Sequence, residues 1–278
     1  MPIFCDSNMA TPFRSVKEMS NFVNSGCCDR FTHSNLNPNK MGNAQLKQHY
    51  ETASKTGVLK ISNKKLKDLP PEVKQLCGVI RNLDLSENHF QTLSDSIAEF
   101  KVLKHFNMSH NKLESLPQCI NQLTKLEIFN ASFNRLHSLP PSIAELSHLK
   151  QVNLSNNLIT QFPEGFCGMK QLDVLDLSHN KITTVPEFVE KLLVSELNLN
   201  QNQVSNISEN LANCPKLKVL RLEENCLTLS QIHLSLLKDS KVHTLCLDGN
   251  LFDSKQLMIQ EGYDDYMARL TAVKKKMF

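Results

Sequence analysis

The chain has 278 residues, of which 40% are hydrophobic and 6% aromatic, and its 31 basic and 28 acidic residues give a formal net charge of +3. This mild charge argues against a nucleic-acid-binding protein, and the sequence has no run of about 20 apolar residues that would predict a membrane-spanning helix. By length alone the chain could form two ordinary domains.

The first 40 residues share no periodicity with the rest of the chain. Their segment "NSGCCDRFTHSNLNPNK" is polar and rich in turn-forming residues, which is typical of a chain that buries too little apolar surface to fold. We therefore expect a flexible N-terminal extension over residues 1–40.

A short helix is predicted next, in "NAQLKQHYETASKTG". Leu46 and Tyr50 share one helical face, Asn43 is a candidate N-cap, and Gly57 is a candidate stop. We interpret residues 41–56 as an N-terminal capping helix for the segment that follows.

From residue 57 to about residue 252 the chain repeats itself. The pattern Leu-x-Leu-x-x-Asn-x-(Leu/Val/Ile/Phe) recurs at intervals of 23, 23, 23, 23, 22, 23 and 25 residues, after a degenerate copy that starts at Val58. Eight in-phase copies exclude chance, and this period is typical of a solenoid. The copies read "LDLSENHF", "FNMSHNKL", "FNASFNRL", "VNLSNNLI", "LDLSHNKI", "LNLNQNQV", "LRLEENCL" and "LCLDGNLF".

Each copy predicts a short strand whose alternate side chains point to opposite faces, so that Leu197 and Leu199 are inside while Asn198 lies on the surface. The asparagine at the following turn can both donate and accept hydrogen bonds. We therefore predict a buried ladder of these side chains that satisfies the backbone groups of the turns. Its members are Asn88, Asn111, Asn134, Asn157, Asn180, Asn202, Asn225 and Asn250.

After each turn the chain runs "LPxxIxxLxxL", and the apolar spacing lengthens from two towards three or four residues. Proline suits the start of a short helical or polyproline-like segment. We predict an α/β solenoid, a curved horseshoe of about nine repeats over residues 57–252, with a parallel sheet on the concave face and short helical or extended segments on the convex face. Residues 253–278 are predicted to form a C-terminal capping helix, because Tyr263, Tyr266 and Leu270 share one face.

In these motifs the chain resembles the leucine-rich repeat family, and "LPxxIxxLxxL" is similar to the repeats of intracellular Ras-pathway scaffolds. From Met41 onward it closely resembles one branch of that family, through "ETASKTGV", "RLEENCL" and "EGYDDYMARLTAVKKK". The resemblance implies that translation starts at Met41 and that Gly42 carries a myristoyl group, which would tether the protein to membranes. If Met1 is the start, Gly42 is internal and stays unmodified.

Cysteine usage favours the cytoplasm. Extracellular members of the family usually carry cysteine-rich caps, whereas neither predicted cap contains a cysteine and the chain has no CxxC pair. An apolar signal-peptide segment is also missing from the N-terminus. We expect a cytoplasmic protein, membrane-associated if Gly42 is acylated, rather than a fragment of an extracellular receptor.

No catalytic, metal or cofactor site is predicted, and we expect the protein not to be an enzyme. Asp176, Ser178 and His179 resemble parts of a nucleophilic triad, but they occupy recurring repeat positions. His110 and His179 lie three repeats apart, roughly 14 Å, and cannot share one ion. None of the eight glycines is followed by lysine, which excludes a phosphate-binding P-loop.

The concave surface remains, and we predict that it binds another protein. The predicted interface consists of Arg81, Asp84, Lys104, Asn107, Glu127, Ile128, Asn130, Phe133, Lys150, Asn153, Asp173, Asp176, Asn198, Lys218 and Arg221. The predicted function is a monomeric intracellular scaffold for protein interaction. The alternative is a regulatory or adaptor subunit of a phosphatase, a Ras-pathway enzyme or a ubiquitin ligase.

Overall fold

The computed structural model describes the backbone of residues 38–277 and the side chains of residues 46–275. Two compact units are distinguished, residues 1–45 and residues 46–278, and the second unit carries the repeats. Nearly all of the predicted N-terminal extension lies outside the described residues.

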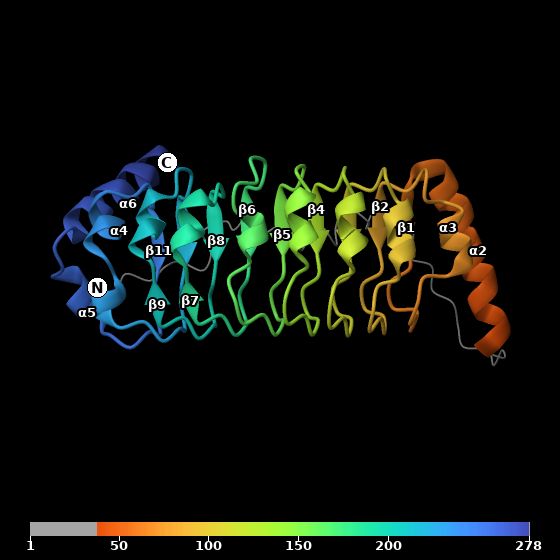
Figure 1. The fold of residues 1–278 in the computed structure, drawn as a ribbon, viewed down its shortest axis with the longest axis horizontal. Coiled ribbons are helices and arrows are strands. Elements are labelled where there is room, and N and C mark those ends of the chain that lie inside the picture. The colour runs from red at the N-terminus through yellow and green to blue at the C-terminus, as the bar shows by residue number, and fades with distance from the viewer. Residues whose placement is uncertain (1–37, 278) are drawn as a thin grey trace. The chain divides into compact units, whose positions relative to one another are not determined.

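The repeats form a parallel sheet whose strands follow one another in chain order (Figure 1). Inward residues are paired across neighbouring strands, as Leu83 with Phe106 and Phe106 with Phe129. The predicted solenoid with a parallel sheet is thereby confirmed. Within the described residues the sheet has nine strands: β1 (Val58–Lys60), β2 (Asn82–Asp84), β3 (His105–Asn107), β4 (Ile128–Asn130), β5 (Gln151–Asn153), β6 (Val174–Asp176), β8 (Glu196–Asn198), β10 (Val219–Arg221) and β11 (Thr244–Cys246).

The return segments form short helices on the convex side, most of them 3-10 helices. A 3-10 helix is narrower than an α-helix, which suits a repeat that is only one strand spacing wide. It also rises about 2.0 Å per residue, so a few residues are enough to cover the convex side. The prolines at 117, 140, 163 and 186 directly precede these helices in extended conformation. The helices are α3 (Pro71–Lys74), η1 (Asp95–Glu99), η2 (Gln118–Gln122), η3 (Pro141–Glu145), η4 (Glu164–Phe166), η5 (Glu187–Lys191), η6 (Glu209–Asn213), η7 (Leu229–Gln231) and α4 (Leu234–Lys238), and β7 (Thr184–Val185) pairs with β9 (Asn206–Ile207).

A continuous hydrophobic core runs through the described repeats, from Ala53 to Leu270. Leu83 in β2 and Leu85 directly after it show the pattern, since they are 2% and 0% exposed. Where Phe129 fills the first inward position, the small Ala131 occupies the second, and both side chains are buried.

The N-terminal helix differs from its prediction. Helix α2 runs over Pro38–Thr56, so Asn43 lies inside it and does not cap it. The earlier start is physically reasonable, because the N–H that proline lacks has no partner in the first turn of a helix. The helix ends as expected before Gly57, which has a φ of +72° and donates its N–H to the carbonyl of Ala53 at 2.8 Å.

The C-terminal segment also differs, because two helices stand where one was predicted. Helices α5 (Ser254–Met258) and α6 (Tyr263–Met277) are separated by a turn in which Gly262 has a φ of +84°. A Cβ at Gly262 would lie 3.0 Å from Cδ1 of Leu234, so this close approach also favours glycine. Helix α6 is held to the last repeat by Arg269, which donates to the carbonyl oxygens of Lys238 at 2.9 Å and Val242 at 3.1 Å.

Candidate functional site on the concave face

The asparagine ladder closes the C-terminal end of each strand. Nδ2 of Asn134 donates to three backbone carbonyls at 2.9–3.2 Å, among them that of Met108 in the preceding repeat, and its Oδ1 accepts the N–H of Leu113 at 3.0 Å. Seven of the eight ladder asparagines are buried, and Asn250, in the last repeat, is half-buried. The ladder therefore serves the fold and offers little surface to a partner.

The residue before each ladder asparagine has a left-handed backbone. The backbone N–H of that residue donates to the next repeat, as that of Phe133 does to the carbonyl of Ser155 at 2.9 Å. The side chains of this left-handed column lie on successive rungs of the sheet. The column, with φ between 53° and 56°, consists of Glu87, His110, Phe133, Asn156, His179, Gln201 and Glu224.

An aromatic pair stands in this column. The rings of His110 and Phe133 stack with centroids 4.2 Å apart and an angle of 10° between their planes. Phe133 is 46% exposed. Asparagine and glycine adopt a positive φ easily, whereas a bulky side chain does so at a cost. An exposed ring at a strained position is typical of a contact surface, and the structure thus keeps Phe133 among the candidate binding residues.

The central column of the predicted interface is mostly used within the protein. Its side-chain oxygens accept the backbone N–H two residues further on at 2.9–3.1 Å, in Asp84, Asn107, Asn130, Asn153, Asp176 and Asn198. Asn130, Asn153 and Asp176 are only 5–8% exposed. Burial raises the pKa of the Asp176 carboxyl, and hydrogen bonds from Ser178 oppose this rise. These three residues have little area left for a partner.

Two ion-pair groups involve further residues of the predicted interface. Glu127 accepts from Nζ of Lys104 at 2.7 Å and from Nζ of Lys150 at 2.6 Å, and these hydrogen bonds lower its pKa to about 2. Nε of Arg221 lies 3.2 Å from Oε1 of Glu196, whose side chain is buried. Burial raises the pKa of Glu196, and the charge of Arg221 opposes that rise.

Arg221 therefore neutralises a buried carboxylate and is not available as an anchor for a partner. The remaining predicted residues stay at the surface. Arg81, Asp173 and Lys218 are exposed before their strands, and Ile128, Asn107 and Asn198 are half-buried on the sheet.

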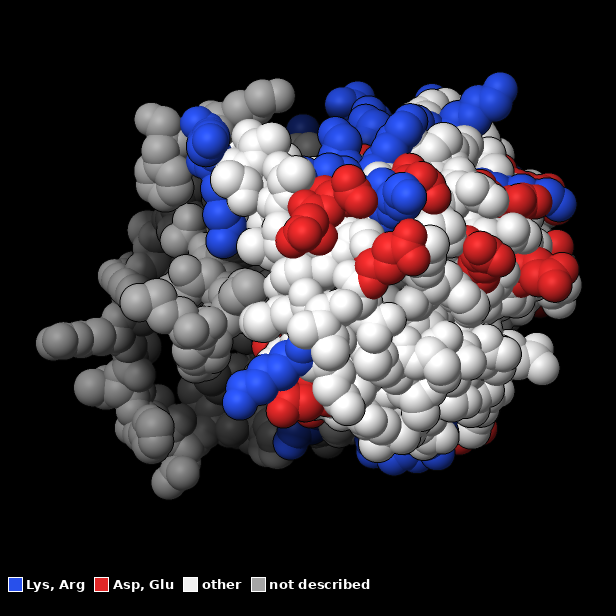
Figure 2. Space-filling view, turned by 90° about the vertical axis from the view of Figure 1, so that its left-hand side faces the viewer, with Lys and Arg blue, Asp and Glu red and all other residues white. Residues whose placement is uncertain are grey.

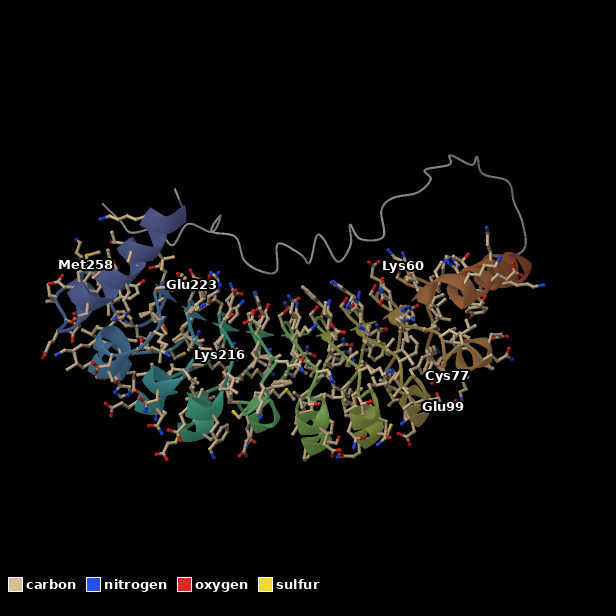
Figure 3. All side chains as sticks on the ribbon, turned by 90° about the horizontal axis from the view of Figure 1, so that it is seen from above. Lys60, Cys77, Glu99, Lys216, Glu223 and Met258 are labelled. Carbon is tan, nitrogen blue, oxygen red and sulfur yellow. The ribbon has the colours of Figure 1, made fainter. Side chains whose placement is uncertain are left out.

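A hollow of about 320 Å³ opens at the C-terminal part of the concave face, where β6, β8, β10 and β11 end. Figure 3 shows Glu223 on this side of the repeats, opposite the convex helices. Amides hold two carboxylates in place, since Asn200 donates to Glu223 and Nε2 of Gln201 donates to Oε2 of Glu224 at 2.7 Å. The lining residues are Ser178, His179, Asn198, Asn200, Gln201, Glu223, Glu224, Asp248 and Gly249.

The hollow is electrostatically negative, because three carboxylates and no lysine or arginine line it. Sequence reasoning missed Glu223, Glu224 and Asp248. The sequence does contain a signal for this hollow at the position directly after the second inward residue of each repeat. That position is serine in five consecutive repeats, from Ser86 to Ser178, and changes to Asn200, Glu223 and Asp248 in the last three. Such an arrangement suits a cationic side chain of a ligand.

Within the part of the chain that the structure describes, no group of three or more His, Cys, Asp or Glu side chains is placed to hold a metal ion. Likewise, none of the described helices has both the length and the apolar composition needed to cross a bilayer.

Comparison with known proteins agrees with the geometry of the repeats. Residues 78–136 and 125–182 match the family model described as leucine rich repeat. The repeats of residues 78–182 are leucine-rich repeats. The asparagine ladder and the left-handed column described above extend the same leucine-rich repeat pattern beyond the matched residues, to Asn225 in β10's repeat.

Solved leucine-rich repeat structures share this fold. An internalin from Listeria monocytogenes is 22% identical with a TM-score of 0.58, over 74% of this chain and 56% of that one. The ectodomain of the receptor kinase GASSHO1/SCHENGEN3 from Arabidopsis thaliana is 23% identical with a TM-score of 0.58, and the match covers 71% of this chain and 28% of that one. The plant peptide hormone receptor RGFR1, solved in complex with RGF2, is 27% identical with a TM-score of 0.56, and the match covers 69% of this chain and 32% of that one. The chain thus spans from 28% to 56% of these proteins.

Proposed function

We propose that this protein is a non-enzymatic interaction module whose concave face binds an extended segment of a protein partner. The observation that carries the proposal is the left-handed column, which sets the exposed ring of Phe133 on the same line as His179, Gln201 and Glu224 of the acidic hollow. An apolar contact and a cation-binding contact then lie on one continuous surface. Buried aromatic and charged anchors usually dominate the binding energy at such interfaces.

The spacing of this line describes the partner. Phe133 and Glu224 follow β4 and β10, which are four rungs apart in the sheet, or about 19 Å at about 4.8 Å per rung. An extended peptide covers this distance in about six residues. The proposed ligand is therefore a segment with an aromatic or aliphatic residue and, about three to six positions away, a lysine or arginine.

The comparisons support this proposal at the level of the fold. Stacked repeats create extended concave surfaces that such proteins commonly use for binding. RGFR1, whose structure was solved with RGF2, shares the fold over 69% of this chain.

A cytoplasmic location and a myristoyl group on Gly42 remain part of the proposal, supported by the cysteine-free caps and the Met41-Gly42 pair. The sequence departs from the general myristoylation motif at Leu46, where that motif has serine or threonine. The mass of the intact protein isolated from its native cell tests the second point. A mature N-terminus at acylated Gly42 supports it, and an N-terminus at Met1 contradicts it.

Peptide selection tests the concave site directly. We expect peptides selected from a random display library by the full chain to share the apolar and basic positions described above. Replacing Phe133 by Asn should weaken their binding at least tenfold, because it removes the apolar anchor. It should also leave stability unchanged or raise it by up to about 1 kcal/mol, because Asn tolerates the left-handed backbone. Fluorescence anisotropy and chemical denaturation measure the two effects.

A matched control uses an exposed apolar residue away from the concave face. Ile259 is 83% exposed in the turn before α6, and Ile259→Asn should leave peptide binding unchanged. If the selected peptides bind the Phe133→Asn protein as tightly as the wild type, the concave site is wrong.

A further inference from the structure

One lateral edge of the repeats carries a larger net positive charge than the whole chain. Eight segments connect the convex helices to the following strands, and together they contain nine lysines or arginines and three acidic residues. Their formal charge of +6 exceeds the +3 of the whole chain, so the rest of the chain is net acidic. We call this set the basic edge: Arg81, Lys101, Lys104, Lys125, Lys150, Lys170, Lys216, Lys218 and Lys241.

The backbone places Arg81, Lys104, Lys150 and Lys218 in one line, and the other five lysines of the set precede positions of this line by two or three residues. The N–H of Lys104 donates to the carbonyl of Arg81, and the same bond recurs in each following repeat until His243 donates to Lys218, at 2.7–3.0 Å. All nine cationic side chains are exposed. Acidic neighbours offset only part of the charge, chiefly Glu127 between Lys104 and Lys150.

The C-terminal cap continues the edge. The contacts of Arg269 dock α6 on the segment between α4 and β11, which belongs to this edge. Figure 1 shows α6 rising towards the upper side of the repeats, and Lys274 and Lys275, exposed near its end, extend the row. Figure 2 shows Lys and Arg gathered along the upper edge of the C-terminal end.

The opposite edge lacks this excess. The eight segments that lead from the strands back to the convex side contain six cations and five acidic residues. A general surplus of surface lysine therefore does not explain the basic edge. The six cations are Lys64, Lys65, Lys67, Lys112, Arg135 and Lys181.

We propose that the basic edge docks the protein on the headgroups of an anionic lipid surface. The edge is nearly level, since its loops end at similar heights in Figure 1, so many rungs can meet a planar surface at the same time. Eight of the nine cations are lysines, which act as point charges and suit diffuse attraction to anionic lipid, whereas arginine favours bidentate recognition. The described edge segments expose no Phe, Tyr or Trp on which a nucleic-acid base could stack.

Docking through this edge leaves the concave face accessible to a protein partner. Figure 3 looks down on the edge and shows Lys216 between Glu223 on the concave side and the convex helices. Lipid contact through the basic edge and partner binding through Phe133 and the acidic hollow therefore use different residues. Arg81, Lys104, Lys150 and Lys218, which the sequence placed in the partner interface, belong to the edge. The proposal does not depend on acylation of Gly42 or on the concave site.

Vesicle co-sedimentation tests the proposal with the unacylated full chain produced in bacteria. We expect binding to vesicles of phosphatidylcholine with phosphatidylserine, and none to phosphatidylcholine alone. Binding should vanish near 1 M salt, where the Debye length is about 3 Å. Each cation near the surface contributes about fivefold, so Lys101→Gln, Lys125→Gln, Lys170→Gln and Lys241→Gln together should weaken binding at least tenfold.

The control variant removes the same charge from the opposite edge, through Lys64→Gln, Lys67→Gln, Lys112→Gln and Lys181→Gln. Its affinity should stay within about threefold of the wild type, because these lysines face away from the lipid. Circular dichroism verifies that both variants are folded. Failure of the wild type to bind phosphatidylserine vesicles overturns the proposal, and so does an equal loss in both variants. A third overturning result is tighter binding of polyuridine RNA than of vesicles, lost in the edge variant.

Discussion

At the scale of single residues, the concave face shows how an apparent binding residue becomes a structural one. Arg221 projects from β10 towards the surface, but its guanidinium neutralises Glu196 on the neighbouring strand at 3.2 Å. A buried carboxylate without a partner is costly, so removing the arginine is expected to harm the fold more than any interface.

This pair predicts a pH-dependent variant. The pKa of Glu196 is already raised in the folded protein, mainly by burial, and Arg221→Ala should raise it further. A carboxyl whose pKa is higher in the folded than in the unfolded state destabilises the protein as pH rises from the unfolded to the folded pKa, and protonation at lower pH relieves the effect. Arg221→Ala should therefore lose about 3–5 kcal/mol at about pH 7.5 and clearly less at about pH 5.

Urea denaturation at the two pH values measures the difference. The double variant Arg221→Ala, Glu196→Gln serves as the control, because it has no carboxyl to titrate and its loss should be the same at both values. A loss in the single variant that does not change with pH would refute this role of Arg221.

At the scale of elements, the convex helices are held at the narrow spacing that the sheet imposes. Most repeats carry a 3-10 helix of three or five residues, and adjacent helices touch closely enough to constrain individual positions. Gly165 at η4 is one such position, since a Cβ built there would lie 2.5 Å from Cγ2 of Ile143 on η3. Its backbone has no positive φ, so the constraint is the neighbouring helix and not the conformation of the glycine.

Gly165→Ala should therefore destabilise the protein by about 1–3 kcal/mol through overpacking. The loss should be smaller in an Ile143→Ala background, where the opposing methyl group is absent. Gly78→Ala is the matched control, because nothing lies within 4 Å of its Cβ and it should be neutral or slightly stabilising. Thermal denaturation of the wild type, Gly165→Ala, Ile143→Ala and the double variant gives the coupling energy between the two positions. An equal cost of Gly165→Ala in both backgrounds would exclude the contact with Ile143.

At the scale of the whole repeat unit, each repeat packs mainly on its neighbours, so stability is expected to be local. The last repeat depends on α6, whose Tyr266 and Leu270 are 7% and 6% exposed against the core. The hydroxyl of Tyr266 also accepts the N–H of Leu245 in β11 at 3.2 Å. The end of the array is thus closed by a few specific contacts.

Leu270→Ala should loosen the C-terminal repeats and leave the middle of the array intact. Hydrogen exchange followed by mass spectrometry should show faster exchange in α4, β10 and β11, with no change in β3 to β5, because stability passes between neighbours only. Leu149→Ala, in the middle of the array, is the comparison and should accelerate exchange around β5. Uniform acceleration throughout the protein after Leu270→Ala would show that the array opens as one unit.

The period by itself determined the architecture. A strand that alternates inward leucines with outward polar residues, followed by an asparagine every 22 to 25 residues, has few ways to bury its apolar side chains except by stacking. The nine-stranded sheet, the inward positions and the hydrogen bonds of the asparagine ladder all follow from this local pattern. The exposure of Phe133 followed as well, because its slot lies outside the inward positions.

Only the tertiary structure decided how surface residues of different repeats combine. Arg221 and Glu196 are 25 residues apart in sequence, and the acidic hollow joins residues from four strands. These contacts depend on the distances between neighbouring rungs and on which side chains reach across them, neither of which a repeat pattern contains. The same holds for the break between α5 and α6, where the turn at Gly262 packs against Leu234 of an earlier helix. A periodic sequence specifies the stacking of its repeats, whereas the departures from the period acquire their roles only when the repeats are side by side.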